Sequence, residues 1–167
     1  MKENKTRYLT QSGIIAAIYV VLLFMFEPIS FSDVQMRIAE ALTILPFFTP
    51  AAIPGLTIGC FIGNFLSGAA ALDVIFGTIA TFIGAVFSYK LRKYKFLVPL
   101  PPILSNTIII PWVLKIAYGM TEVPIYIMML TVGIGEIISC GLFGLILLFA
   151  LDKVKHVIFS NSFLEKN

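Results

Sequence analysis

The chain has 167 residues, of which 59% are hydrophobic and only 13% are charged, and its mean hydropathy is +0.97. A soluble domain carries about a quarter of its residues as charged side chains, so most of this surface must face lipid. The formal net charge of +3 does not indicate a nucleic-acid-binding protein, because the basic residues cluster at the ends of apolar segments. We expect an all-α integral membrane protein with one transmembrane domain over residues 1–167.

The first half of the chain begins with a basic stretch and an apolar run, the pattern of a signal peptide. No A-x-A-like cleavage site follows the run over residues 9–26, so we interpret it as a retained first span. The second segment, 34–48, is shorter than the about 20 residues that a helix needs to cross the hydrocarbon core. The third span, 51–72, contains no charged residue, and Asp73 marks the next boundary.

Three further apolar segments follow, over residues 74–89, 96–118 and 123–151. A basic cluster at residues 90–95 separates the fourth from the fifth. If segment 34–48 were re-entrant, leaving five spans, either this cluster or the basic N-terminus would face outward. The positive-inside rule therefore favours six transmembrane helices with both termini cytoplasmic.

Few polar residues lie at membrane depth, and an intramembrane charge is a functional candidate by default. Arg37 and Glu40 are three residues apart and share a helical face, so they can either pair with each other or contact a ligand. Glu136 has no residue of opposite charge in its own helix. It needs a partner on another helix, a proton or a ligand, and it is the strongest single candidate.

The fifth span offers a second group of candidates. Asn106 lies one residue before Thr107, whose carbonyl would lose its helical partner to Pro111. Trp112 is either an interfacial anchor or a stacking platform. Lys115 lies near the expected outer end, where its side chain can snorkel to the interface.

Small residues predict close helix packing in the first and third spans. Gly55, Gly59 and Gly63 recur every four residues and are followed by Asn64, which can hydrogen-bond across helices or contact a ligand. Gly13, Ala16 and Ala17 form a second small patch, which serves ordinary packing or a separate protein. Cys60 and Cys140 are expected to act as small packing residues, with no metal site.

No P-loop sequence G-x-x-x-x-G-K-S/T, no H-E-x-x-H and no G-x-S-x-G is present. A hydrolytic enzyme, a metal-dependent enzyme and a self-contained ATPase are therefore not expected, and no cofactor is predicted. A small chain with a polar cluster and no energy source is typical of the ligand-binding part of a larger transporter.

Two runs carry a family resemblance. The run VQMRIAEALTILPFFTPAAIPGLTIGCFIGN (residues 34–64) and the run VGIGEIISC (residues 132–140) resemble the QueT family. Members are substrate-binding S components of energy-coupling factor (ECF) transporters of the bacterial cell membrane, and the resemblance covers essentially the whole chain. It implies an S-component-like bundle, a scaffold membrane protein contacted by Gly13, Ala16 and Ala17, and two cytoplasmic ATPases. S components usually have a pair of alanines four residues apart at this place, and here Gly13 stands where the first of them is expected.

The resemblance also implies a queuosine precursor as substrate, either the aminomethyl deazaguanine or queuine. We expect Glu136 and Asn106 to read the base, Glu40 or Asn64 to add contacts and Trp112 to stack, with Arg37 and Lys115 as minor candidates. Two alternatives stay open at this point. The chain could bind another small aromatic or vitamin ligand on the same scaffold, or it could be a ligand-free assembly subunit.

Overall fold

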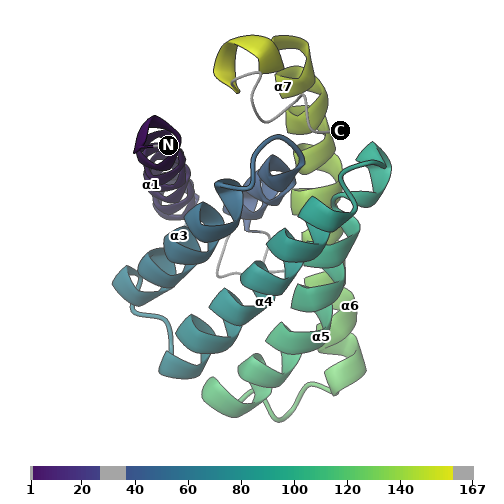
Figure 1. The fold of residues 1–167 in the computed structure, drawn as a ribbon. Coiled ribbons are helices and arrows are strands. Elements are labelled where there is room, and N and C mark those ends of the chain that lie inside the picture. Colours follow the sequence, from purple (N-terminus) through teal and green to yellow (C-terminus); the bar gives the residue numbers. More distant parts are fainter. Residues whose placement is uncertain (1, 27–36, 160–167) are drawn as a thin grey trace.

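The computed structural model describes residues 2–26 and 37–159, and every regular element in these ranges is helical (Figure 1). The predicted all-α membrane fold is thus confirmed. The first three residues of the second expected segment, 34–36, and the preceding loop lie outside the described residues. The elements are α1 (Lys2–Met25), the 3-10 helix η1 (Ile38–Phe47), α3 (Ala52–Leu66), α4 (Ala71–Lys90), the 3-10 turn η2 (Lys95–Leu97), α5 (Leu100–Ala117), α6 (Ile125–Glu136), the π-helix η3 (Ile137–Phe143) and α7 (Gly144–Ile158).

Four helical stretches of the described chain are long and apolar enough to cross a membrane. They are Lys5–Met25, Ala71–Lys90, Lys95–Ala117 and Ile125–Lys155, while Ile38–Phe47 and Ala52–Leu66 are shorter apolar helices. Large apolar side chains such as Phe65 and Ile116 face outward, with 67% and 68% of their surface exposed. An apolar exterior of this kind requires a lipid environment. The exact limits of each span remain a prediction.

The short second segment is an internal element. Residues Ala39 to Pro46 of η1 are all buried, and η1 contacts α1, α3, α4, α7 and η3. A 3-10 helix rises about 2.0 Å per residue, so its ten residues reach farther than the same number in an α-helix. Non-α backbone at membrane depth is tolerated where protein surrounds it, and η1 has that surrounding.

The glycine stripe of α3 packs against α1, as predicted. A Cβ added at Gly55 would lie 2.8 Å from the Ser12 carbonyl oxygen, and one at Gly59 would lie 2.9 Å from Tyr19 Cβ. One at Gly63 would meet Leu23. Because the contact positions rise together along both helices, α1 and α3 run parallel, and η1 must return the chain between them.

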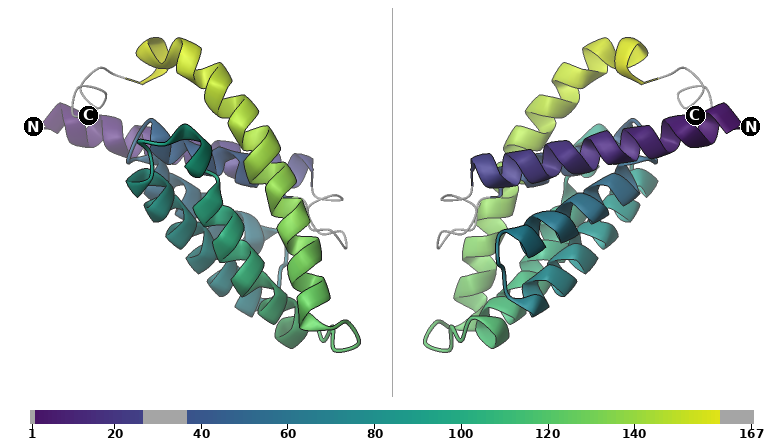
Figure 2. Two further views of the ribbon diagram at one scale, coloured as in Figure 1. Left: turned by 90° about the vertical axis from the view of Figure 1, so that its right-hand side faces the viewer. Right: turned by 90° about the vertical axis from the view of Figure 1, so that its left-hand side faces the viewer.

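The later helices alternate in direction. α4 packs along both α3 and α5, and Gly84 lies so close to α5 that an added Cβ would come within 2.8 Å of Pro102 Cα. α6, η3 and α7 form one continuous curved rod (Figure 2). The π-helix lies in the middle of this rod, at a position where helices commonly bend.

Ion pairs and hydrogen bonds mark the two ends of the bundle. At one end, Lys95 lies 2.7 Å from Asp152, which also pairs with Lys155 at 3.0 Å. At the other end, the Tyr118 hydroxyl accepts a hydrogen bond from the Ala70 amide at 3.2 Å. The 90–95 cluster and the end of α7 therefore share one end of the molecule. This arrangement fits the predicted topology, whose cytoplasmic sidedness stays a prediction.

Candidate functional site

A column of buried polar side chains runs through the apolar bundle between η1, α3, α4 and the α6–η3 junction. We call this set the polar column. Each of the members named below is at most 4% exposed, in a protein whose outer surface is mostly apolar. Its members include Arg37, Glu40, Cys60, Asn64, Asp73, Thr81, Asn106, Glu136 and Cys140, joined by Tyr19 from α1.

One end of the column, at the start of α4, is centred on Arg37, which directly precedes η1. Its guanidinium forms an ion pair with Asp73 in the first turn of α4, with 3.3 Å between Nη2 and Oδ2. Tyr118, which follows α5, donates its hydroxyl to the same Asp73 oxygen at 3.0 Å. Asp73 was expected only to mark an outer boundary, but it lies buried, and it draws η1, α4 and α5 together.

A glycine makes room for this group. A Cβ added at Gly77, one turn along α4, would lie 3.1 Å from the Asn64 amide nitrogen and 3.3 Å from an Asp73 oxygen. Asn64 itself is fully buried, donates to Cys60 Sγ at 3.6 Å, and leaves its Oδ1 without a hydrogen-bond partner among the described residues. An unpaired buried acceptor is costly, so Asn64 is suited to an additional donor.

Glu40 forms the middle of the column. Its Oε1 accepts hydrogen bonds from the Tyr19 hydroxyl at 2.5 Å and from Thr81 Oγ1 at 3.4 Å. Its Oε2 has no hydrogen-bond partner among the described residues, although the side chain is only 1% exposed. Sequence reasoning left Arg37 and Glu40 to pair with each other or with a ligand. In the structure, Arg37 has its ion pair with Asp73, and two hydroxyls hold Glu40.

Glu136 meets Glu40 from the opposite side. One ligand atom from each of Glu40, Glu136 and Cys140 lies within 4.8 Å of the others. The Cys140 thiol donates to Glu136 Oε2 at 3.1 Å and lies 3.4 Å from the Glu40 carbonyl oxygen. The Asn106 side chain, from α5, interacts with both carboxylates. Three helical elements that are distant in sequence therefore converge on one point.

The local sequence explains this convergence. Glu136 ends α6 and the π-helix follows at once, so Glu136, Ser139 and Cys140 are all buried. Gly144, at the start of α7, allows the rod to approach η1, since an added Cβ would lie 3.0 Å from Ile44 Cγ2. π-helical turns are frequent at functional sites, and this one brings Glu136 and Cys140 against Glu40.

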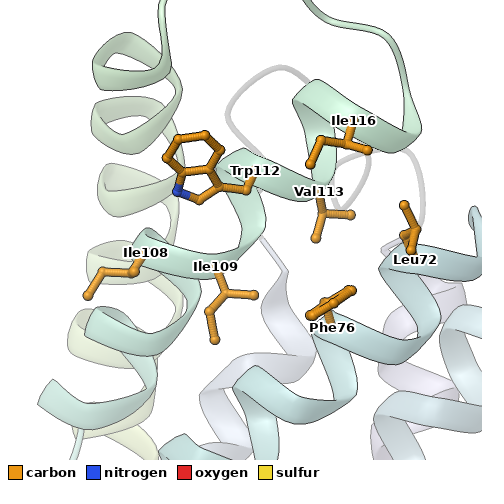
Figure 3. A pocket seen from close by; sticks show the side chains of 7 residues that line it. All are labelled: Leu72, Phe76, Ile108, Ile109, Trp112, Val113 and Ile116. Atoms are coloured by element: carbon orange, nitrogen blue, oxygen red, sulfur yellow. The ribbon is translucent and has the colours of Figure 1, made fainter.

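Two predicted site residues lie elsewhere. Trp112 is 50% exposed and lines an apolar groove of about 260 Å³ with Phe76, Leu72 and other aliphatic residues (Figure 3). Lys115 is half-buried in the last turn of α5. At about 100° per residue, Lys115 lies roughly opposite Asn106 on that helix. The expected stacking of Trp112 on a ligand read by Asn106 does not match this placement, because Asn106 lies on the buried face and Trp112 on the exposed one.

The small residues of α1 divide between two faces. Ala16 is 8% exposed and packs on Gly59 of α3. Gly13 and Ala17 are exposed, and an added Cβ at Gly13 would meet no heavy atom within 4 Å. Gly13 and Ala17 are therefore available to a separate protein, whereas Ala16 is used within the chain.

Sequence reasoning missed Tyr19, Thr81 and Cys140 as site residues. Tyr19 is the one tyrosine inside the apolar run 9–26, and the need of a buried carboxylate for a donor could have indicated it. Thr81 gave no signal, because isolated threonines are common in membrane helices. Cys140 follows Glu136 by four residues, a spacing that places both on one helical face.

The chemistry of the site follows from its donors and acceptors. The carboxylates of Glu40 and Glu136 accept hydrogen bonds, and the Asn106 amide offers both donors and an acceptor. Such a set suits a ligand rich in N–H groups with a carbonyl beside them.

The chain is similar in sequence to known proteins. The family model described as the QueT transporter matches residues 9–153. The chain is 39% identical over 85 residues to a protein of Lactococcus lactis subsp. cremoris (strain MG1363) named "Queuosine precursor transporter QueT". That alignment covers 50% of this chain and 50% of the relative, so the matched part spans about half the length of the curated protein. No solved structure matches the chain.

Proposed function

This chain belongs to the QueT transporter family, and from that premise we propose that it is the substrate-binding membrane subunit of an importer for a queuosine precursor. The name of its Lactococcus lactis relative supports this substrate class. The observation that carries the proposal is the convergence of Glu40, Glu136 and Asn106 at one buried point of a lipid-facing bundle. Burying two carboxylates in such a place is unfavourable unless a bound partner offsets the loss of their hydration with favourable interactions.

The polar inventory of the site suits a 7-deazaguanine. The base carries N–H donors and a carbonyl oxygen, which match carboxylate acceptors and an amide. Glu136, Asn106 and Glu40 are the contact residues in this proposal. Asn64 lies farther along the column, and its Oδ1 has no hydrogen-bond partner in the part of the chain that the structure describes. Trp112 and Lys115 are left out, because they lie away from the convergence point.

Binding can be tested directly on purified protein. Glu136→Ala removes a buried acceptor of charged hydrogen bonds, which we expect to weaken precursor binding by at least about tenfold. Glu122→Ala is the matched control, since Glu122 is exposed in the turn between α5 and α6. Calorimetric titration would measure both variants, and native mass spectrometry would detect a co-purified base. Equal affinities in the two variants would remove Glu136 from the site.

Energy for import would come from other subunits. The sequence has no P-loop, so we propose that an ECF scaffold protein and two cytoplasmic ATPases in the bacterial cell membrane drive transport. Vesicles containing this protein alone should then show no uptake of precursor, whereas vesicles with the complete complex and ATP should show it. Uptake by the chain alone would indicate a self-sufficient carrier.

The exposed small face of α1 is the proposed scaffold contact. Gly13→Leu and Ala17→Leu place bulk on this face without touching the polar column. We expect both to reduce co-purification with the scaffold while leaving precursor affinity unchanged. Ala71→Leu is a control, because Ala71 is a small exposed residue on α4. An equal loss with Ala71→Leu would argue against a specific contact through α1.

A further inference from the structure

The turn between α4 and α5 carries four basic residues and no acidic one in the stretch YKLRKYKFL (residues 89–97). We define the basic turn as the four cations and the two exposed aromatic side chains of this stretch: Lys90, Arg92, Lys93, Lys95, Tyr94 and Phe96. Among the described residues, Lys95 forms an ion pair with Asp152, whereas Lys90 and Lys93 pair with no carboxylate. Both of these lysines are exposed, so their ammonium groups are available to an external anion.

Two contacts with α7 hold the basic turn in place (Figure 1). Lys95 Nζ lies 2.7 Å from a carboxylate oxygen of Asp152. The centroid of the Phe96 ring lies 5.7 Å from that of Phe149, in a tilted arrangement that is favourable for aromatic pairs. The turn is therefore a fixed surface of the folded protein and differs in this respect from a freely moving basic tail.

Aromatic rings of α4 position two of the cations. Lys90 Nζ lies 4.9 Å from the centroid of the Phe87 ring, and Arg92 Cζ lies 4.3 Å from the centroid of the Tyr89 ring. A cation over the face of a ring is attracted by the ring quadrupole. Phe87 is itself exposed on the apolar exterior. These contacts therefore keep the positive charge beside the apolar flank of α4.

The length of α4 places the basic turn at the depth of the phospholipid head groups. The helix has 20 residues and is about 30 Å long, which equals the thickness of the hydrocarbon core. Its last residue, Lys90, therefore reaches one interface when its first turn lies at the other. Tyr94 and Phe96 are 62% and 73% exposed, and aromatic side chains so exposed are stabilised by the interface of a bilayer. The turn thus offers cations and apolar rings at the same level.

We propose that the basic turn binds an anionic phospholipid, whose phosphate contacts Lys90 and Lys93 and whose acyl chain packs on Tyr94 and Phe96. A phospholipid supplies both parts in one molecule, because its phosphate oxygens accept charge-assisted hydrogen bonds and its hydrocarbon chain lies directly beside them. The flexible stems of two lysines three positions apart allow both ammonium groups to reach one phosphate. Basic clusters that adjoin a membrane helix attract anionic lipids. An acidic protein partner would account for the lysines but not for exposed rings at this depth.

This surface is separate from the substrate site. No residue of the basic turn belongs to the polar column, and the inference does not depend on the proposed function. It concerns which lipid the protein holds in the bilayer, and precursor binding is not part of its test.

The test compares two lipids that differ in head-group charge. Purified full-length protein in detergent is titrated with phosphatidylglycerol and with phosphatidylcholine of the same acyl chains, and native mass spectrometry measures the affinity of the first bound lipid. We expect phosphatidylglycerol to bind the wild-type protein at least about tenfold more tightly. The double variant Lys90→Gln/Lys93→Gln should bring the two affinities within about threefold of each other and leave phosphatidylcholine binding unchanged. The matched control Lys5→Gln/Arg7→Gln removes two exposed cations from α1 and should keep the wild-type preference.

Three results would overturn the proposal. Equal affinity of the wild-type protein for the two lipids would show that the head-group charge is not recognised. Equal losses in the two double variants would show a general attraction by positive charge and no site at this turn. If inorganic phosphate displaces the lipid more than chloride does at the same ionic strength, the turn binds a free anion. A wild-type protein without lipid preference, combined with loss of other membrane subunits from Lys90→Gln/Lys93→Gln on purification, would assign the turn to a protein partner.

A second measurement locates the lipid without any substitution, so it decides even where the double variant fails to fold. Wild-type protein is irradiated with phosphatidylglycerol that carries a photoreactive group in its head group, and the labelled peptides are sequenced. Label within residues 87–97 supports the proposal, and label confined to α1 overturns it.

Discussion

Arg37 and Asp73 form a buried ion pair that joins the start of η1 to the first turn of α4. Their side chains are 5% and 2% exposed, and 3.3 Å separates Nη2 from Oδ2. Glu40 follows Arg37 by three residues, about one turn of a 3-10 helix, and meets Thr81 two turns farther along α4. The ion pair therefore holds η1 at one rotation about its own axis, and at that rotation the Glu40 side chain faces α4.

Removing one member of this ion pair should destabilise the protein strongly. Asp73→Asn leaves the Arg37 charge buried, and breaking a buried pair costs about 3–5 kcal/mol. Thermal unfolding in detergent would measure the effect. Asp152→Asn is the matched control: its ion pairs with Lys95 and Lys155 are partly exposed, and pairs of that kind contribute about 0–1 kcal/mol. Similar losses in the two variants would contradict the role given to Asp73.

Tyr19 should support ligand binding through Glu40. Tyr19→Phe removes only the hydroxyl that donates to Glu40 Oε1, and a hydrogen bond to a charged group contributes about 1.5–3 kcal/mol. We expect the carboxylate to lose its fixed orientation and precursor affinity to fall by about tenfold. Tyr126→Phe makes the same change at an exposed position and should leave affinity unaltered. Titration calorimetry would distinguish the two, and an unchanged Kd for Tyr19→Phe would show that Glu40 needs no such support.

The α1–α3 contact should tolerate no added methyl group at Gly59. A Cβ there would lie 2.9 Å from Tyr19 Cβ and 3.0 Å from the Ala16 carbonyl oxygen, so Gly59→Ala must displace backbone. Overpacking of this kind costs about 1–3 kcal/mol, visible as a lower unfolding temperature. Gly13→Ala, in open space on the same helix pair, should instead raise stability by up to about 1 kcal/mol through helix propensity. Equal effects of the two changes would mean that the helices do not pack as described.

Trp112 should contribute little to ligand affinity. It lines an apolar groove on the outer side of α4 and α5 (Figure 3), away from the convergence of Glu40 and Glu136. We therefore expect Trp112→Leu to change precursor affinity by less than about threefold, whereas Asn106→Leu, on the buried face of the same helix, should weaken it by at least about tenfold. A large loss with Trp112→Leu in the same titrations would restore the stacking role that the sequence suggested.

Much of the fold could be predicted from the chain alone. The apolar segments, their order and the glycine stripe of α3 are local properties, because hydropathy and i, i+4 spacing depend only on neighbouring residues. The site was only partly predictable. Glu40, Asn106 and Glu136 were candidates because charged and amide groups are rare in lipid, and rarity is visible in a sequence.

Tertiary structure decided which of these residues act together. Arg37 lies three residues from Glu40, yet its ion pair is with Asp73, 36 positions away. Tyr19, from the first helix, completes the surroundings of Glu40, while Trp112 and Lys115 face away from Asn106. The sequence by itself determined that a few polar groups must be buried in an apolar bundle. Only the packing of η1 against α4 and the π-helix determined their partners, because a buried polar group is satisfied by whatever donor the fold brings within about 3 Å, regardless of its distance along the chain.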